Sequence, residues 1–145
     1  MPIYSLSVSG TEGALAFHAL DLFAQGYITA AFWLGDEESG IPDLSFEDLH
    51  PETLNRMVDT CAVFQKANEA ALKIAYEGGQ EARGGRNPYF PFVAGVDLFL
   101  TRNGHGAGYW DSGLAGESGT DLANAARLLG ESSLYLGDDR RLYLL

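Results

Sequence analysis

Two stretches of apolar residues at helical spacing constrain the fold most strongly. In residues 20–32, apolar side chains recur at i, i+3, i+4 and i+7, which predicts an amphipathic helix of about four turns that ends near Gly35. A second stripe follows Pro51, a residue favoured in the first turn of a helix, and predicts a helix of about 25 residues that ends near Glu77. Gly26 weakens the first helix by about 1 kcal/mol relative to alanine. A close helix crossing or a partner backbone at Gly26 would explain its presence.

Elsewhere the apolar residues alternate with a period of two, which is typical of strands. Residues 3–9 predict a first strand, which the sequence GTEG at residues 10–13 then ends. Thr120–Gly130 predicts a third helix, because a threonine N-cap opens this segment and a glycine closes it. The other predicted strands are residues 96–102, 107–110, 132–137 and 141–145.

The predicted order of elements is β-α-α-β-β-α-β-β, an α+β fold in which helices pack on a mostly antiparallel sheet. The short connections at residues 103–106 and 138–140 favour antiparallel pairing of the strands that they join. The length of 145 residues suits a single domain. We expect an acidic loop at residues 35–50 and a flexible loop at residues 78–92 between the regular elements.

The segment LTRNGHGAGYWD, residues 100–111, gathers reactive types of side chain around three glycines. A structural interpretation makes it the tip of a hairpin, because Asn103 and Gly104 both tolerate the positive φ angles of a tight turn. Under this interpretation Arg102 and Asp111 pair across the turn. The segment then needs no catalytic role to explain its composition.

A catalytic interpretation of the same segment makes His105 a general base that Asp97 or Asp111 orients. Proton transfer requires a histidine within hydrogen-bond reach of an orienting group and of the substrate. A third interpretation makes Tyr109 and Trp110 a partner-binding patch, because aromatic side chains dominate interface energetics. Turn chemistry explains most of the segment, so the structural interpretation is favoured and an enzyme is the less favoured class.

Cysteine and histidine usage argues against other kinds of chemistry. Cys61 is the sole cysteine, which excludes an internal disulfide, and its place on an apolar helical stripe favours packing over reactivity. A nucleophilic pair of Cys61 with His105 is therefore weakly supported, because it depends on one thiol that we expect to be buried. His18, His50 and His105 show neither HxH nor HxxxH spacing, so we expect no metal site and no cofactor.

The N-terminal third of the chain is strongly acidic. From Met1 to Asn55 there is no lysine or arginine, and the whole chain carries a formal charge of −11. Such a field repels nucleic acid and attracts a basic protein surface. Acidity that only keeps the protein soluble is the alternative. The expected partner-binding carboxylates are Asp36, Glu37, Glu38, Asp43, Glu47, Asp48 and Glu52.

The sequence DLFLTRNGHGAGYWD, followed after some 25 residues by GDDRRLYLL, resembles a group of small proteins of tailed phages, prophages and plasmids. The helical segments QGYITAAFW and LHPETLNRMVDTC are similar to the N-terminal parts of that group. Val96 stands where the group usually has a histidine, and Arg140 replaces a turn glycine. The resemblance implies a mobile-element origin rather than a mechanism, and the missing histidine removes a potential partner of His105.

These observations predict a phage-type acidic binding protein that inhibits a host nucleic-acid machine, such as a CRISPR effector, by occupying its basic surface. The expected partner is a host protein or ribonucleoprotein complex, with no direct nucleic-acid binding. A small enzyme that uses His105 with Asp97 or Asp111 is one alternative. Another is a phage accessory domain that forms a homodimer through Trp33, Tyr109 or Trp110. No apolar stretch approaches the roughly 20 residues that span a bilayer, and no signal peptide is visible, so we expect the cytoplasm.

Overall fold

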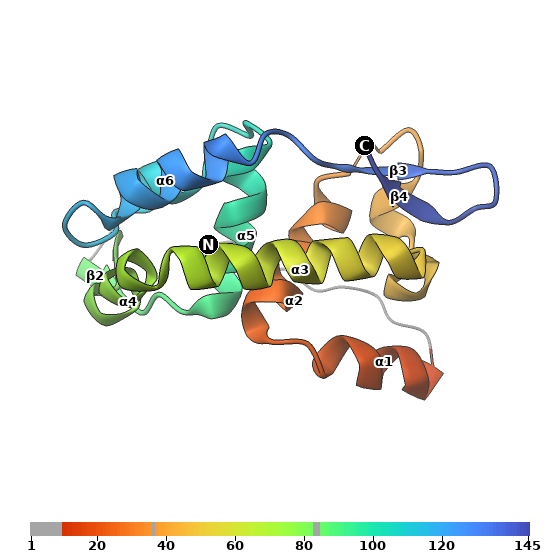
Figure 1. Cartoon of the computed structure of the whole chain (residues 1–145), viewed down its shortest axis with the longest axis horizontal. Coiled ribbons are helices and arrows are strands. Elements are labelled where there is room, and N and C mark those ends of the chain that lie inside the picture. Colours follow the sequence, from red (N-terminus) through yellow and green to blue (C-terminus); the bar gives the residue numbers. More distant parts are fainter. Residues whose placement is uncertain (1–9, 36, 83–84) are drawn as a thin grey trace.

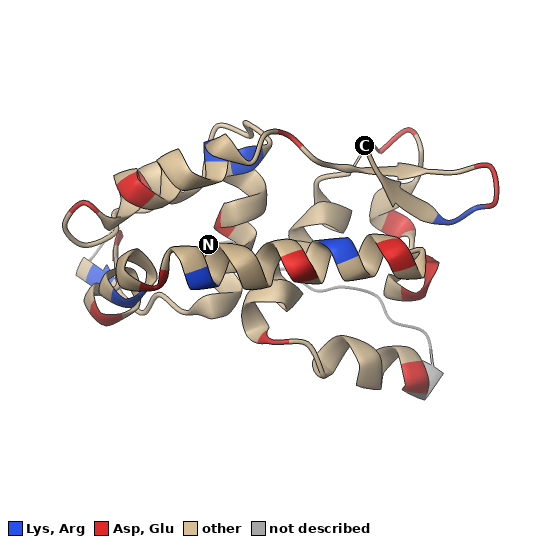
Figure 2. Cartoon of the chain, viewed as in Figure 1, with Lys and Arg blue, Asp and Glu red and all other residues tan. Residues whose placement is uncertain are grey.

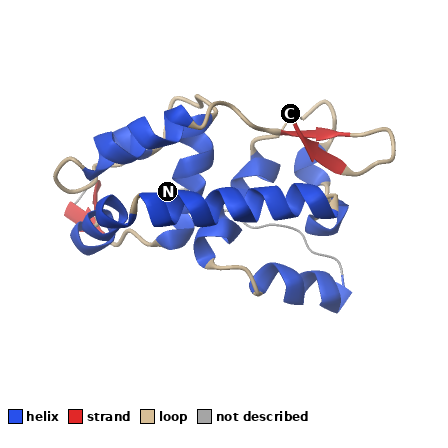
Figure 3. Cartoon of the chain, viewed as in Figure 1, coloured by secondary structure: helices blue, strands red, loops and turns tan. Residues whose placement is uncertain are grey.

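The computed structural model describes residues 10–35, 37–82 and 85–145, and most of these residues are helical (Figures 1 and 3). The α-helices are α1 (Gly10–His18), α2 (Leu22–Trp33), α3 (Pro51–Ala67), α4 (Glu69–Gly78), α5 (Pro91–Arg102) and α6 (Ser118–Leu128). Three short 3-10 helices are η1 (Ile41–Asp43), η2 (Phe46–Asp48) and η3 (Tyr109–Asp111). The strands are β1 (Gln80–Ala82), β2 (Gly85–Asn87), β3 (Leu134–Leu136) and β4 (Leu142–Leu144).

The predicted α+β fold is wrong for the described residues. The strands form two separate two-stranded antiparallel hairpins, β1–β2 and β3–β4, and no helical layer rests on an extended sheet. The expected strand at residues 3–9 lies outside the described residues. The GTEG sequence was expected to end that strand but lies in α1, which packs through an edge-to-face contact of Phe17 with Phe46, ring centroids 5.4 Å apart.

The segment predicted as a strand at residues 96–102 is the second half of α5. All residues from Val93 to Phe99 are buried. A helix that is surrounded by protein has no polar face, so its sequence lacks the 3.6-residue period that distinguishes a helix from a buried strand. The segment 107–110, predicted as the second strand of this hairpin, instead leads into the 3-10 turn η3.

Helices α2 and α5 form the centre of the molecule and touch backbone to backbone. A Cβ atom on Gly26 would lie 1.9 Å from the carbonyl oxygen of Phe92, and one on Gly95 would lie 1.9 Å from that of Phe23. The close crossing expected at Gly26 is therefore confirmed, with α5 as the partner. Gly95 supplies the same clearance from the other helix.

The long helix predicted after Pro51 is divided at Asn68. Its backbone angles, φ −123° and ψ 26°, lie outside the helical range, and its side-chain amide donates to the carbonyl of Phe64 at 2.9 Å. The chain continues as α4, and Figure 1 shows α3 crossing α2 and α5. Phe64 packs in the core against Phe23 and stacks on Tyr109, with ring centroids 6.1 and 6.0 Å apart.

Two C-terminal predictions are confirmed. Helix α6 is closed at Gly130, whose φ of 74° suits glycine, but its N-cap is Glu117 and the expected N-cap Thr120 lies inside the helix. Strand β3 pairs with β4 in the expected hairpin, with Tyr135 opposite Tyr143. Residues 78–92, expected as a loop, contain the β1–β2 hairpin. Within the described ranges, no helix has both the length and the apolar character that crossing a membrane requires.

Candidate functional site

The motif residues 100–111 fold as the end of α5 and the turns that follow it. Asn103 ends the helix: its side-chain nitrogen donates to the carbonyl of Phe99, and its side-chain oxygen accepts from the backbone N–H of Ser132. Asn103 therefore joins α5 to the chain that leads into β3. The prediction placed Asn103 in a hairpin turn because its backbone tolerates positive φ angles. In the structure Asn103 instead acts through the nitrogen and the oxygen of its side-chain amide.

Arg102 binds the end of α6 rather than Asp111. Its Nε donates to the carbonyl of Gly130 at 2.8 Å, and Nη2 donates to that of Leu129 at 3.2 Å. Its Nη1 donates to the hydroxyl of Tyr27 on α2 at 3.1 Å. A cation at a helix C-terminus stabilises the exposed carbonyl groups there. The expected pairing of Arg102 with Asp111 is wrong, and Arg102 instead holds α2, α5 and α6 together.

Asp97 is the centre of a buried hydrogen-bond network. The Tyr89 hydroxyl donates to its Oδ2 at 2.6 Å, and the Ser112 hydroxyl lies 3.0 Å from the same oxygen. Only 4% of Asp97 is exposed. Burial raises the pKa of Asp97 from its ordinary value of 3.8 to about 6; the hydrogen bonds from Tyr89 and Ser112 oppose this rise, and the nearby charge of Asp111 adds to it.

The turns between α5 and η3 are built around Gly108 and Thr101. The backbone N–H of Gly108 donates to Asp111 at 2.9 Å, and that of Tyr109 donates to the Thr101 hydroxyl at 3.0 Å. A Cβ atom on Gly108 would lie 2.1 Å from that hydroxyl oxygen. The Tyr109 ring is fully buried, and its hydroxyl donates to the carbonyl of Ala94. Trp110, by contrast, is 53% exposed and is the surface member of the aromatic pair.

His105 is exposed, and its ring stacks on Phe99 with centroids 5.8 Å apart. Asp97 bonds to Tyr89 and Ser112, and Asp111 bonds to Gly108, so both candidate orienting carboxylates have other partners. In the described chain, no hydrogen bond joins the His105 ring to either carboxylate. The structure therefore does not assemble the expected catalytic pair.

The remaining thiol and metal chemistry is equally unsupported by geometry. Cys61 is 1% exposed, and burial, followed by the charge of Asp21, raises the pKa of its thiol. A raised pKa favours the protonated thiol, which is a poor nucleophile compared with the thiolate. No group of three or more potential metal ligands occurs among the residues that the structure describes.

His105 does line a groove of about 500 Å³ beside the β3–β4 hairpin. One wall carries Leu34 and Ile41, and the other is strand β3. The polar groups of the groove include Asn103 and Glu131. The sequence predicted the hairpin but gave no sign of this groove, because its walls come from segments roughly 100 residues apart.

The predicted acidic segment lies at one end of the long axis of the molecule (Figure 2). Phe46 packs it against α1, and the backbone N–H of His50 donates to the carbonyl of Leu142 in β4 at 3.1 Å. These contacts bring Glu12 of α1 and the turn of the C-terminal hairpin to the same end. The described carboxylates there are Glu12, Glu37, Glu38, Asp43, Glu47, Asp48, Glu52, Asp138 and Asp139.

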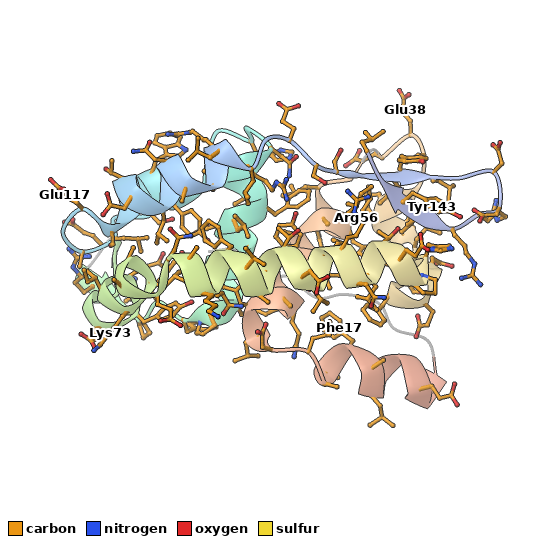
Figure 4. All side chains as sticks on the ribbon, viewed as in Figure 1. Phe17, Glu38, Arg56, Lys73, Glu117 and Tyr143 are labelled. Atoms are coloured by element: carbon orange, nitrogen blue, oxygen red, sulfur yellow. The ribbon has the colours of Figure 1, made fainter. Side chains whose placement is uncertain are left out.

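Most carboxylates at this end, which we call the acidic end, belong to exposed residues, and Glu38 projects outward in Figure 4. Asp48 is only partly exposed and accepts from the backbone N–H of Ser45, so it also has a structural role. Asp36 lies outside the described residues. The basic residues at the same end are Arg56, Arg140 and Arg141, so carboxylates outnumber them.

Comparisons with known proteins add no relative. No protein-family model matches the chain, and neither the curated proteins nor the solved structures contain a match. The kinship with phage proteins that the NGHGAG segment suggests therefore stays a prediction.

Proposed function

We propose that this protein is a phage-type binding protein whose acidic end occupies the basic, nucleic-acid-binding surface of a host protein or ribonucleoprotein and thereby inhibits it. The observation that carries the proposal is the gathering of nine carboxylates from α1, the segment 37–52 and the C-terminal turn at one end of the molecule. The opposite end mixes both signs of charge (Figure 2). Charge that gathers on one surface, rather than being spread evenly, favours a role beyond solubility.

Electrostatics explains how such a surface would work. Exposed carboxylates attract a lysine- and arginine-lined channel over about one Debye length, which is about 8 Å at physiological salt. They compete there with the phosphates that the channel normally holds, and the contact should weaken as salt rises. The net charge of −11 disfavours direct binding of the protein to DNA or RNA.

The resemblance of residues 97–111 to proteins of phages and plasmids directs the choice of partner. Elements of this kind meet host defence systems that act on nucleic acids, and a CRISPR effector complex is the partner that we propose. Within the motif, Arg102 and Asn103 join α5 to the segments that follow α6, which is a structural role. The motif therefore supports the proposal through the origin that it suggests and not through contact with a partner.

The test uses two triple variants with matched positions. In the first, Glu37→Gln, Asp43→Asn and Glu52→Gln remove three exposed charges from the acidic end. The control variant carries the changes Glu69→Gln, Glu117→Gln and Asp121→Asn, which remove three exposed charges elsewhere. The control removes two carboxylates from first turns of α-helices, Glu69 and Asp121, and the acidic-end variant removes one, Glu52, so loss of helix stability should affect the control at least as much.

Each protein is added to purified host CRISPR effector complexes with labelled target DNA, at 50 and 300 mM NaCl, and the retained DNA is measured. Efficiency of phage plating on the same host gives a second readout. We expect the unaltered protein to displace DNA at low salt, the acidic-end variant to lose at least tenfold in potency, and the control to stay within threefold. Equal potency of both variants, or no displacement at low salt, would refute the proposal.

A further inference from the structure

The two outer edges of the C-terminal hairpin differ in what covers them. On the β4 side, Leu49 forms a parallel bridge with Leu142, and the backbone N–H of His50 donates to the Leu142 carbonyl at 3.1 Å. The segment 49–50 therefore acts as a short third strand beside β4. No strand or bridge pairs with the other side of β3 in the described part of the chain, although the 3-10 helix η1 lies near β3.

The hydrogen bonds within the hairpin show which groups of β3 face outward. Gly137 donates to Arg141, and Leu145 donates to Ser133, so these pairs are the hydrogen-bonded ones. Pairs in an antiparallel ladder alternate between bonded and non-bonded. The backbone N–H and C=O groups of Leu134 and Leu136 therefore point away from β4, and no described residue pairs with them.

These outward groups face a hollow rather than flat surface. Leu134 and Leu136 line the groove of about 500 Å³, which Leu34 and Ile41 also line. An unpaired strand edge is a template for another strand, which lies about 4.8 Å away in the hydrogen-bonding direction. The groove thus offers backbone hydrogen bonds along one side and apolar contacts along the other.

We propose that the outer edge of β3 is a docking site for an extended segment of a partner protein, which adds a strand to the hairpin. A segment of about four residues, at 3.3 Å each, would cover the edge. Glu131 lines the groove, and Glu37 and Glu38 lie close in sequence to Ser39, which also lines it. The carboxylate of Glu131 and the apolar lining favour a segment that carries lysine or arginine beside an apolar residue.

A second copy of the chain suits this edge poorly. Edge-to-edge pairing would bring the two acidic ends together, and each chain carries a net charge of −11. Like charges at short range oppose such pairing. The preference for a basic segment rests on the function proposed above, whereas the strand pairing itself depends only on the exposed edge.

The probe is a fluorescein-labelled peptide, Lys-Val-Lys-Val-Lys-Val, with a second form that is N-methylated at alternate residues. Fluorescence anisotropy measures affinity, and hydrogen exchange by NMR follows the amides of Leu134 and Leu136. We expect the peptide to bind and to slow exchange at both amides at least tenfold. The N-methylated form, which cannot donate from one side of its backbone, should bind at least tenfold more weakly.

Matched proline substitutions separate the two edges. Leu136→Pro removes an outward N–H from β3, and Leu144→Pro removes an outward N–H from β4 beyond its contact with residues 49–50; no backbone acceptor for either N–H is found among the described residues, so proline removes no ladder bond. Leu136→Pro should weaken peptide binding at least tenfold and Leu144→Pro less than threefold, with circular dichroism confirming that both variants fold. If either variant fails to fold, the N-methylated peptide decides the question alone.

Three results would overturn the inference: no binding of the peptide, equal binding of its N-methylated form, or dimerisation by light scattering that Leu136→Pro abolishes. A control peptide, Thr-Val-Thr-Val-Thr-Val, keeps the strand but not the charge. If the acidic-end variant binds this peptide, the edge of β3 pairs with a strand even in a protein that no longer inhibits the host complex. The two proposals can therefore fail separately.

Discussion

The buried carboxylate of Asp97 leads to a specific dependence of stability on pH. Its pKa rises from 3.8 to about 6 on folding, mainly through burial. The folded chain therefore binds a proton at Asp97 over a pH range where the unfolded chain has lost it. As pH rises from about 4 to about 6, the free energy of unfolding falls, because the folded state comes to hold a buried charge.

The size of this effect follows from the shift. A rise of about two pKa units corresponds to about 3 kcal/mol of stability lost between acidic and neutral pH. About 2 kcal/mol of that loss should occur between pH 4.5 and pH 7. Asp97→Asn removes the titration while keeping the shape of the side chain, and its amide can donate to Ser112 where a protonated carboxyl would do so.

The assay is urea unfolding of both proteins, followed by far-ultraviolet circular dichroism at pH 4.5, 5.5, 6.2 and 7.0. The free energy of unfolding of Asp97→Asn minus that of the unaltered protein should grow by about 2 kcal/mol from the lowest to the highest pH. A constant cost of fitting the amide cancels in this comparison. Asn124→Ala, at an exposed site without a titratable group, is the control and should give a difference constant to about 0.5 kcal/mol. A flat or falling difference for Asp97→Asn would refute the reasoning.

Three further substitutions test the helix packing and the backbone conformation. Gly26→Ala or Gly95→Ala should lower the free energy of unfolding by about 2 to 3 kcal/mol in urea, because each new Cβ forces α2 and α5 apart. The control Gly13→Ala meets the side chain of Glu47 and not a backbone, so it should cost less than about 1 kcal/mol, and equal losses at all three sites would contradict this account. Arg140→Gly should raise it by about 1 kcal/mol, because Arg140 adopts a φ of 63° that costs a side chain about this much; a decrease would show that the arginine has a stabilising contact.

Two of the elements that the sequence predicted have one exposed and one buried face, whereas the predicted helix α2 is buried throughout residues 23–32. Helix α6 and the β3–β4 hairpin carry their own end signals, Gly130 and the turn at residues 138–140. Helix α5 has no exposed face over most of its length, so its apolar run matched a strand as well as a helix. The break between α3 and α4 occurs at one residue, Asn68. Asparagine also occurs inside helices, so the sequence did not predict a break at this position.

The candidate site shows a different limit of sequence reasoning. The motif at residues 100–111 gathers reactive residue types, yet Arg102 binds helix carbonyls and Asp97 binds Tyr89. The partner of Arg102 is Gly130, which is distant in sequence, and the partner of Asp97 is Tyr89, which lies in a segment without a motif. The acidic segment was visible in the sequence, but its union with Glu12 and the C-terminal turn depends on tertiary contacts of Phe46 and His50.

The two proposed surfaces adjoin each other, and they should act at different stages of one encounter. Exposed carboxylates steer a basic partner over several ångströms, so removing them should lower the association rate and reduce its dependence on salt. Strand pairing at β3 forms only after contact, so loss of the outward N–H of Leu136 should mainly raise the dissociation rate. Surface plasmon resonance of the acidic-end variant and of Leu136→Pro, against the partner found in the displacement assay, would separate these effects. If both variants changed only the dissociation rate, the carboxylates would be acting as short-range contacts, and steering would have no part in recognition.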